Sequence, residues 1–446
     1  MRSRAELGAS RARLVLAFGA TVPFLLWASV GGSAEDANAP RPLPLESRLA
    51  IIARAAPDVR SALPLRLDSR YSNPCWRETN GTTRRLRCMP AFFVAGALQS
   101  GVPDFWRRLR VHGLIGSHHD ALSHWWTNHP RSRAGTFDTY VSRFSTASAI
   151  EGVEREPRTL LGDASPATFT YIMAESLRLH YMYLDAFDAC YRRCRDGRRA
   201  GGGGPAVPEA CRGPGYHYDH CYAEASRATV PSDFNVPALA ATVLPNLRVI
   251  VLLREPARRL WCAYWAYGQY PAKYGAAAAG FGYYFGNQSA AFAGCAAEHG
   301  TPACALRFES HGVAQAGLYY HADQLIKGMY AEFLPEWQTY VPTKRLLVVR
   351  TDEYFARPIR AVRRAWQWLG LRPPSADEND GARALKADDE LVRASAAHGA
   401  PQDYPALLRP VRAFYAPFNA RLAGMLRDPG FTRGQWAPPR TRHSGV

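Results

Sequence analysis

Lysine is scarce in this sequence of 446 residues. Only four lysines occur, although lysine and arginine together number 55 against 38 acidic residues, so arginine carries nearly all of the positive charge. Charged residues of both signs make up 21% of the chain, which argues against a coiled coil or a solvated tail protein. Long apolar runs are also rare. The one candidate lies near the N-terminus, which excludes a multi-span membrane protein.

The chain nevertheless has the composition of a large globular protein with a strongly basic surface. Hydrophobic residues make up 47% and aromatic residues 12%, and the net charge is +17. At roughly 150 residues per domain, the length allows up to three domains. The charge favours an anionic partner such as a nucleic acid, a sulfated or phosphorylated ligand, or a membrane surface. A GC-rich genome would produce a similar arginine excess, so charge alone leaves the partner open.

The N-terminal residues have the form of a targeting segment. A basic flank precedes the apolar run Leu14–Val30, and small residues follow as far as Ala34. This order predicts an uncleaved signal-anchor over residues 1–34, with a cleaved signal peptide as the alternative, and both deliver the rest of the chain to a lumen. By composition, residues 35–87 are predicted to form a stem, about 195–232 a surface insertion and 437–446 a tail.

Nine cysteines agree with an oxidising compartment. Cys75 with Cys88, and Cys295 with Cys304, are spaced for small disulfide loops. The four cysteines between residues 190 and 221 are able to form two more, which leaves Cys262 over. Zinc binding by these four is the alternative, but their spacing fits no common zinc finger. Two glycosylation sequons begin at Asn80 and Asn287 and point to the same compartment.

Three short, continuous apolar runs predict buried parallel strands, and a helix-like stretch follows each of them. The runs are Ala91–Ala95, Arg248–Leu253 and Arg345–Val349. After the third, Pro358–Leu369 has its apolar residues on one face and ends at Gly370. This alternation predicts an α/β fold with a central parallel sheet flanked by helices.

The first predicted strand leads into a loop bounded by Gly96 and Gly101, and then into a helix predicted over Phe105–His112. Backbone N–H groups and the dipole of the helix would point at one spot and so form an anion cradle. Pro103 suits the first helical turn. The loop is not a Walker loop, because the G-x-x-x-x-G-K-[ST] pattern is absent.

The second predicted strand ends at Arg254. Open α/β sheets bind ligands at this end of their strands, and a guanidinium there is able to grip a phosphate through two hydrogen bonds. Pairing of Arg254 with Glu255 is the structural alternative. Pro256 is expected to open the next helix, with Cys262 about two turns in and facing back toward Arg254.

Both segments resemble motifs of the carbohydrate sulfotransferases. Residues 92–113 (FFVAGALQSGVPDFWRRLRVHG) look like the loop that holds the 5′-phosphosulfate of PAPS (3′-phosphoadenylyl sulfate) in this family, and residues 249–267 look like its 3′-phosphate motif. Further matches follow in order at 123–126, 162–166, 317–325, 351–355 and 414–422. The His-Trp-Trp segment is most similar to enzymes that 6-sulfate N-acetylgalactosamine 4-sulfate. The resemblance covers about Cys88 to Trp436.

The resemblance implies one sulfotransferase domain with a P-loop-like fold over 88–436, which transfers a sulfuryl group from PAPS to a hydroxyl of a glycosaminoglycan-like carbohydrate without a metal. With the N-terminal segment, this predicts a single-pass type II protein of the Golgi membrane, or a secreted one if the signal is cleaved. A nucleic-acid partner is favoured only by the charge and is opposed by the signal, the sequons and the cysteines. His124 is the expected catalytic base, since an imidazole commonly has a pKa of about 6.5; a structural histidine packed beside two tryptophans is the alternative. The expected donor-binding residues are Gln99, Ser100, Gly101, Val102, Pro103, Asp104, Arg254 and Cys262.

The sequence departs from the family pattern at functional positions. Gln99 replaces the loop lysine, while Val102 and Pro103 replace two hydroxyl residues. Leu122 stands where the family often has a glutamate base, and Cys262 replaces a serine. If another cation does the work of the lysine, Arg107 and Arg108 are the nearest candidates on the following helix. These losses leave a second reading open: a catalytically impaired relative that binds nucleotide or sulfated glycan.

Overall fold

The computed structural model describes the part of the chain that carries the predicted strands and the candidate site. The described residues are 42–63, 66–80, 82–116, 122–127, 135–171, 177–199, 221, 224–225, 234–308, 311, 322–385 and 404–432. The predicted signal-anchor and tail, and most of the predicted insertion, lie outside these ranges. Among the described helices, none is long and apolar enough to cross a membrane.

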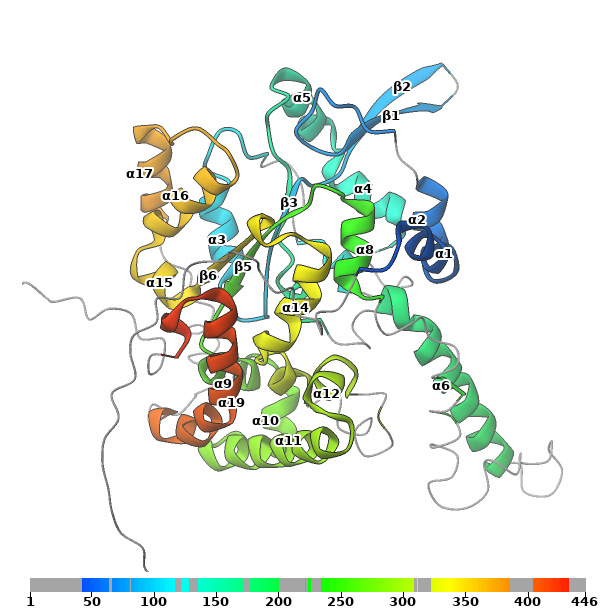
Figure 1. Cartoon of the computed structure of the whole chain (residues 1–446), viewed down its shortest axis with the longest axis vertical. Coiled ribbons are helices and arrows are strands. Elements are labelled where there is room, and N and C mark those ends of the chain that lie inside the picture. The colour runs from blue at the N-terminus through cyan, green and yellow to red at the C-terminus, as the bar shows by residue number, and fades with distance from the viewer. Residues whose placement is uncertain are drawn as a thin grey trace, which may run out of the picture. The chain divides into compact units, whose positions relative to one another are not determined.

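A four-stranded parallel sheet forms the centre of the fold, as predicted (Figure 1). Its strands are β3 (Phe92–Gly96), β4 (Gly162–Asp163), β5 (Arg248–Leu253) and β6 (Leu346–Arg350), in the order β4-β3-β5-β6. Every neighbouring pair is parallel. The three apolar runs therefore do form adjacent strands, within one residue of the predicted bounds. Their side chains are apolar at successive positions because helices cover both faces of the sheet.

Alternate residues of β3 and β5 enter two separate cores. One core holds Val94 and Ile250 together with α3 (Val102–Leu109), α16 (Pro358–Trp368) and α17 (Ala376–Ala384). The other holds Ala95 and Val251 with α8 (Val236–Val243), α9 (Pro256–Ala266), α14 (Tyr330–Tyr340) and α19 (Tyr404–Leu426). The two groups of helices pack on opposite faces of the sheet, which completes the three-layer α/β architecture.

The remaining described elements surround these layers. They are α1 (Leu45–Ala55), α2 (Pro57–Ala62), β1 (Cys75–Asn80), β2 (Thr83–Cys88), η1 (Trp125–Thr127), α4 (Phe137–Phe144), α5 (Ala147–Arg155), η2 (Pro166–Thr168), α6 (Leu177–Arg199), α10 (Gln269–Tyr274), α11 (Ala278–His299), α12 (Thr301–Arg307), η5 (Thr343–Arg345), α15 (Thr351–Ala356) and η6 (Pro429–Phe431).

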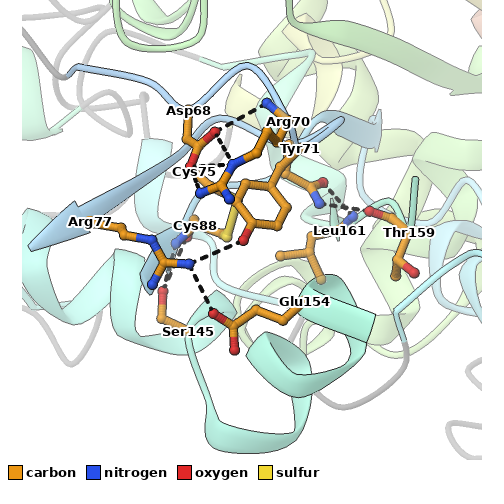
Figure 2. Close-up of a disulfide and its surroundings, with 11 residues drawn as sticks. Asp68, Arg70, Tyr71, Cys75, Arg77, Cys88, Ser145, Glu154, Thr159 and Leu161 are labelled. Carbon is orange, nitrogen blue, oxygen red and sulfur yellow. Dashed lines mark hydrogen bonds and ion pairs between the residues drawn. A yellow bond between two sulfur atoms is a disulfide. The ribbon is translucent and has the colours of Figure 1, made fainter. Parts of the chain in front are cut away.

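The described part of the predicted stem is folded, contrary to the expectation from its composition. Ile52 of α1 and Val59 of α2 are fully buried in the larger core. β1 and β2 form an antiparallel hairpin that the Cys75–Cys88 disulfide closes (Figure 2). Just before the hairpin, the Asn73 side chain donates to the Thr159 carbonyl and accepts from the Leu161 N–H. These long-range contacts attach the segment to the chain that enters β4, which composition alone does not reveal.

Three disulfides are described, and they include both predicted local pairs. Cys75 bonds to Cys88 and Cys295 to Cys304, while Cys190 bonds to Cys221. Cys194 is disulfide-bonded as well, and Cys262 is a buried free thiol, as the odd count predicted. Disulfides of this kind form and persist in oxidising compartments.

The helix after β3 begins earlier than predicted. α3 spans Val102–Leu109, three residues ahead of the predicted Phe105–His112. The reason is the left-handed conformation of Gly101 (φ 82°), from which the chain enters the helix at once, with Pro103 in the first turn as expected. The helix predicted over Pro358–Leu369 is confirmed as α16, and Gly370 follows its end with φ 77°.

Candidate functional site

The candidate donor site lies where the order of the strands reverses. β3 and β5 are neighbours in the sheet, but the chain leaves β3 toward β4 and leaves β5 toward β6, on opposite sides. The residues that follow these two strands, 97–101 and Arg254, therefore meet at the carboxyl edge of the sheet. Ligands of open α/β sheets bind at such a switch point. The sequence placed both segments at strand ends, and the structure brings them together.

Two glycines shape the loop after β3. A Cβ added to Gly96 would lie 2.5 Å from the Leu252 carbonyl oxygen of β5, so only glycine allows the strands to approach this closely. A Cβ on Gly101 would lie 3.1 Å from the Phe355 ring, and its φ of 82° also favours glycine. Both glycines are thus required by the path of the loop.

Backbone strain also marks the candidate residues. Three described non-glycine residues have φ in the left-handed region, and two of them are Gln99 (φ 68°) and His124 (φ 49°). This conformation typically costs on the order of 1–2 kcal/mol for a residue with a side chain. Such strain clusters at functional sites because the surrounding structure has to hold it in place. It supports a role for the loop and for the segment around His124.

The loop carries polar atoms whose hydrogen-bonding capacity is unused. Gln99 Oε1 and Ser100 Oγ are buried and have no partner among the residues that the structure describes. Buried polar atoms are normally satisfied, so each exception needs an explanation such as a ligand. A serine hydroxyl is able to donate to an oxyanion, whereas an amide oxygen only accepts, so Gln99 Oε1 suits a hydrogen-bond donor of a ligand. Ser100 Oγ therefore fits an anionic group, and Gln99 Oε1 fits a donor group beside it.

Arg254 is hydrogen-bonded both to this loop and to α14. Its Nη1 donates to the Gln99 carbonyl oxygen (3.1 Å), and its own carbonyl accepts from the Tyr330 hydroxyl (2.8 Å). Only 5% of the residue is exposed. The neighbouring Glu255 caps α9, accepting from the N–H groups of Ala257 and Arg258, and burial raises its pKa. The structure thus places a guanidinium beside the residue that replaces the family lysine.

Two residues after β6 complete the edge, and sequence reasoning gave them no role. The Thr351 hydroxyl donates to the Ser100 carbonyl (2.9 Å), and the Phe355 ring covers Gly101. Both belong to α15, which starts at the carboxyl end of β6. The available signal was their position after the third apolar run, because the ends of neighbouring parallel strands share one edge.

Asp104 is directed into the protein rather than toward the loop. Its carboxylate, in the first turn of α3, is 2.6 Å from Arg107 Nη2 and 3.2 Å from Arg108 Nε, and it accepts from the Tyr354 hydroxyl. Burial and this carboxylate raise the pKa of Tyr354. Arg108 is buried and also donates to the Ala382 carbonyl (2.6 Å). The two arginines considered as substitutes for the lysine thus balance the charge of Asp104.

The 3′-phosphate motif is partly structural. Arg259 is fully buried and donates to the side chain and the carbonyl of Gln324, which ties α9 to that segment. Cys262 is also buried, and its thiol donates to the Arg258 carbonyl one turn earlier in α9. Cys262 was expected to face Arg254, but its thiol proton is used in the hydrogen bond to the Arg258 carbonyl. Arg254 is the member of the motif that contacts the loop.

The His124 segment lies over β4, the strand beside β3. The backbone N–H of His124 donates to Ser165 Oγ (2.8 Å), and His124 itself is half-buried. Trp125 and Trp126, the first two residues of η1, are fully buried and donate to the Thr136 carbonyl and the Tyr140 hydroxyl, respectively. The two segments matched to the family separately, 123–126 and 162–166, are therefore directly bonded to each other.

A buried carboxylate organises this contact. Asp163 accepts hydrogen bonds from the hydroxyls of Ser123 (2.7 Å), Tyr140 (3.1 Å) and Ser165. Each hydroxyl also accepts one bond, from Trp125 N, Trp126 Nε1 and His124 N respectively. Burial raises the pKa of Asp163 to about 6, against the lowering effect of its three hydroxyl partners. The network fixes the backbone on both sides of the His124 side chain.

Groups of potential metal ligands lie away from this edge. Within the described residues they are Cys190 with Cys194 and Cys221, and Cys295 with Cys304 and His311. All five of these cysteines are disulfide-bonded, so their sulfurs are not free thiolates. The cysteines of both groups lie close together because they form disulfide bonds.

Comparison with known proteins supports the resemblance to the carbohydrate sulfotransferases. No family model matches the chain. The chain is 24% identical over 368 residues to carbohydrate sulfotransferase 15 of Homo sapiens and 24% identical over 363 residues to that of Mus musculus. The matches cover 79% and 78% of this chain. They cover 56% and 55% of the relatives, so the chain spans about half the length of the curated relatives it matches.

Among solved structures, the chain resembles a crystal structure of a sulfotransferase from Alicyclobacillus acidocaldarius. The two share 14% identity with a TM-score of 0.40, over 76% of this chain and 96% of the other. The sequence similarity over more than three quarters of the chain confirms the resemblance of this protein to the carbohydrate sulfotransferases.

Proposed function

We propose that this protein is a sulfotransferase that transfers a sulfuryl group from PAPS to a hydroxyl of a carbohydrate. The observation that carries the proposal is the meeting of the 96–101 loop with Arg254 at the switch point, where the buried Ser100 Oγ has no partner among the described residues. The similarity to carbohydrate sulfotransferases supports the same activity. It also favours an enzyme over the catalytically impaired alternative.

The residues present at the edge fit an anionic donor. PAPS, when bound, supplies an activated sulfuryl group. The N–H groups at the start of α3 and the Ser100 hydroxyl would hold the 5′-phosphosulfate, because the first turn of a helix has N–H groups without intrahelical partners and a positive dipole end. Pro103 supplies no N–H to this cradle. The guanidinium of Arg254 would bind the 3′-phosphate.

While it binds the 3′-phosphate, Arg254 would also contribute its positive charge to the transfer step through space, rather than by contact with the sulfuryl group. The family lysine is replaced by Gln99, whose amide donates hydrogen bonds but carries no charge. Arg254 is bonded to the carbonyl of Gln99, so its positive charge lies beside the loop. Arg107 and Arg108 already balance the carboxylate of Asp104. A preorganised cation at the site of developing negative charge is often the largest single contribution to catalysis.

His124 is the proposed general base. Its neutral imidazole would accept the proton of the acceptor hydroxyl as that oxygen attacks. The bond from its backbone to Ser165, and the left-handed φ of 49°, hold the residue in one conformation at the edge of β4. Leu122, at the position of the family glutamate, is 43% exposed and offers no proton acceptor.

The proposed function is tested with the purified protein, radiolabelled PAPS and a panel of glycans. We expect binding of adenosine 3′,5′-bisphosphate and transfer of label to at least one glycan, at a rate lowered by the missing lysine. Failure to bind the nucleotide would contradict the proposal. Nucleotide binding without transfer to any glycan would instead favour the catalytically impaired relative.

We also propose that the protein works in the Golgi lumen, attached by its N-terminal segment, with secretion as the alternative. The disulfides support an oxidising compartment. Expression in a secretory host should give a glycan at Asn80 or Asn287, detectable as a mobility shift after enzymatic deglycosylation. A cytosolic protein without glycan would contradict this location.

A further inference from the structure

The outer face of α16 carries a row of exposed arginines. Arg360, Arg363 and Arg364 lie on the helix, and Arg357 immediately precedes it. Residues three and four apart are neighbours on a helix surface, so the side chains form one group about 10 Å long. The opposite face, with Trp366 fully buried and bonded to the Leu109 carbonyl of α3, fixes the orientation of the helix.

This group of arginines is not neutralised. Within the described part of the chain, none of the four forms an ion pair or hydrogen bond with another side chain. The adjacent Glu353 is paired with Arg350 instead. Other exposed arginines do have acidic partners, as Arg158 has Glu156. Like charges three and four residues apart on a helix repel one another, so the arrangement is unfavourable without an anionic ligand.

The surface around the arginines is hollowed on both sides. A hollow of about 350 Å³ extends from Val349, Ala356 and the Arg350-paired Glu353 to the arginines, and a second of about 690 Å³ continues to Arg383 on α17. Arg357, Arg360 and Arg364 line both hollows. The guanidinium groups therefore border a groove rather than standing on a convex surface.

The groove begins close to the candidate donor site but is separate from it. Ala356 and Arg357, which line the smaller hollow, directly follow Phe355, the residue that covers Gly101. The groove then runs away from the donor loop along α16. A long acceptor chain would be able to occupy the edge of the sheet and the groove together.

We propose that this arginine groove, formed by Arg357, Arg360, Arg363 and Arg364, binds a sulfated polysaccharide outside the donor site. Guanidinium groups match tetrahedral oxyanions through paired hydrogen bonds. The disulfides place the chain in an oxidising compartment, which disfavours a nucleic acid. A membrane surface is disfavoured because none of the large exposed apolar side chains lies on α16. The binding itself does not depend on the proposed function, but its use to hold an acceptor does.

Binding to heparin, measured without nucleotide at several salt concentrations, tests the groove. The variant R360Q/R363Q/R364Q should bind about 10- to 100-fold more weakly, if each exposed contact contributes about 0.5–1 kcal/mol. Its affinity should also depend less steeply on salt, because fewer counterions are released. The control R54Q/R84Q/R155Q removes the same charge from three separated, exposed arginines and should stay within about twofold of the wild type.

Nucleotide binding and competing probes make the outcome decisive. Binding of adenosine 3′,5′-bisphosphate should be unchanged in the groove variant; a wild type that binds heparin but no nucleotide would overturn the proposed function and leave the groove standing. Equal weakening in both variants, or in neither, would overturn the groove. Desulfated heparin, phosphatidylserine vesicles and single-stranded DNA serve as competing probes. If any of them binds as tightly as heparin and with the same dependence on α16, the assignment to sulfated polysaccharide is wrong.

Discussion

Two polar regions at the carboxyl edge of one sheet differ in how their hydrogen bonds are satisfied. Around Asp163, each of three hydroxyls both donates and accepts, and the carboxylate is completely enclosed. In the loop after β3, two buried polar atoms, Gln99 Oε1 and Ser100 Oγ, have no partner in the described part of the chain. The first region is complete within the protein, whereas the second has capacity left for a ligand. We therefore assign the Asp163 network to holding the site rigid and the loop after β3 to binding the ligand.

Of the two regions, the Asp163 network should contribute more to the stability of the folded protein. Asp163→Ala leaves three buried hydroxyls without their acceptor, so we expect the free energy of unfolding to fall by about 3–5 kcal/mol. Urea unfolding followed by circular dichroism measures the change. Glu151→Ala, at an exposed position of α5, is the matched control and should change stability by less than about 0.5 kcal/mol. A loss of similar size in both variants would remove the distinction between the regions.

The raised pKa of Asp163 gives this network a pH dependence of known sign. The folded protein favours the neutral carboxyl, whose pKa is about 6, whereas the unfolded chain ionises near pH 4. The contribution of Asp163 is therefore fully present below pH 4 and is lost as pH rises through 6. The stability difference between wild type and Asp163→Asn should decrease by up to about 3 kcal/mol over that interval. A difference that stays constant or increases with pH would show that the carboxyl is ionised in the fold.

Substitutions in the loop region should lower the affinity for the ligand rather than the stability of the protein. Arg254→Ala removes a charge-assisted contact, so we expect the affinity for adenosine 3′,5′-bisphosphate to fall about 30- to 150-fold, or about 2–3 kcal/mol. Isothermal titration calorimetry provides the dissociation constant. Arg345→Ala, at the opposite end of the sheet, is the control and should bind like the wild type. If Arg254→Ala does so too, the phosphate assignment of this segment is wrong.

The smallest expected effect is a gain of activity at the same loop. Gln99→Lys restores a cation beside the position of the leaving oxygen, a type of contribution that elsewhere amounts to about 10²–10³ in rate. We expect a gain of about tenfold in the transfer rate, because Pro103 and Leu122 still lack a hydroxyl and a carboxylate. Gln99→Met, which adds no charge, should not gain. A wild-type rate of about 1 s⁻¹ or more, with no benefit from lysine, would indicate that Arg254 already performs this role.

The parts of the fold that depend on residues close together in the sequence could be predicted from the sequence alone. The three long strands, the glycine-bounded loop and Arg254 at a strand end were all predicted, because buried strands have continuous apolar runs and their ends follow directly. The Cys75–Cys88 and Cys295–Cys304 disulfides were predicted from their short separations. Gly101 was found in the same way, although the helix it precedes begins three residues earlier than expected.

Only the tertiary structure decided which distant residues meet. The bond between Thr351 and Ser100 joins positions 251 residues apart, and the Ser123–Asp163 bond joins positions 40 apart. Both depend on the order of the strands, which no local pattern specifies. The burial of Ile52 within the predicted stem, and the absence of acidic partners around Arg360 in the described chain, likewise depend on how elements pack. Sequence determines which groups a segment offers, but their pairing, burial and exposure follow from the free energy of the whole fold.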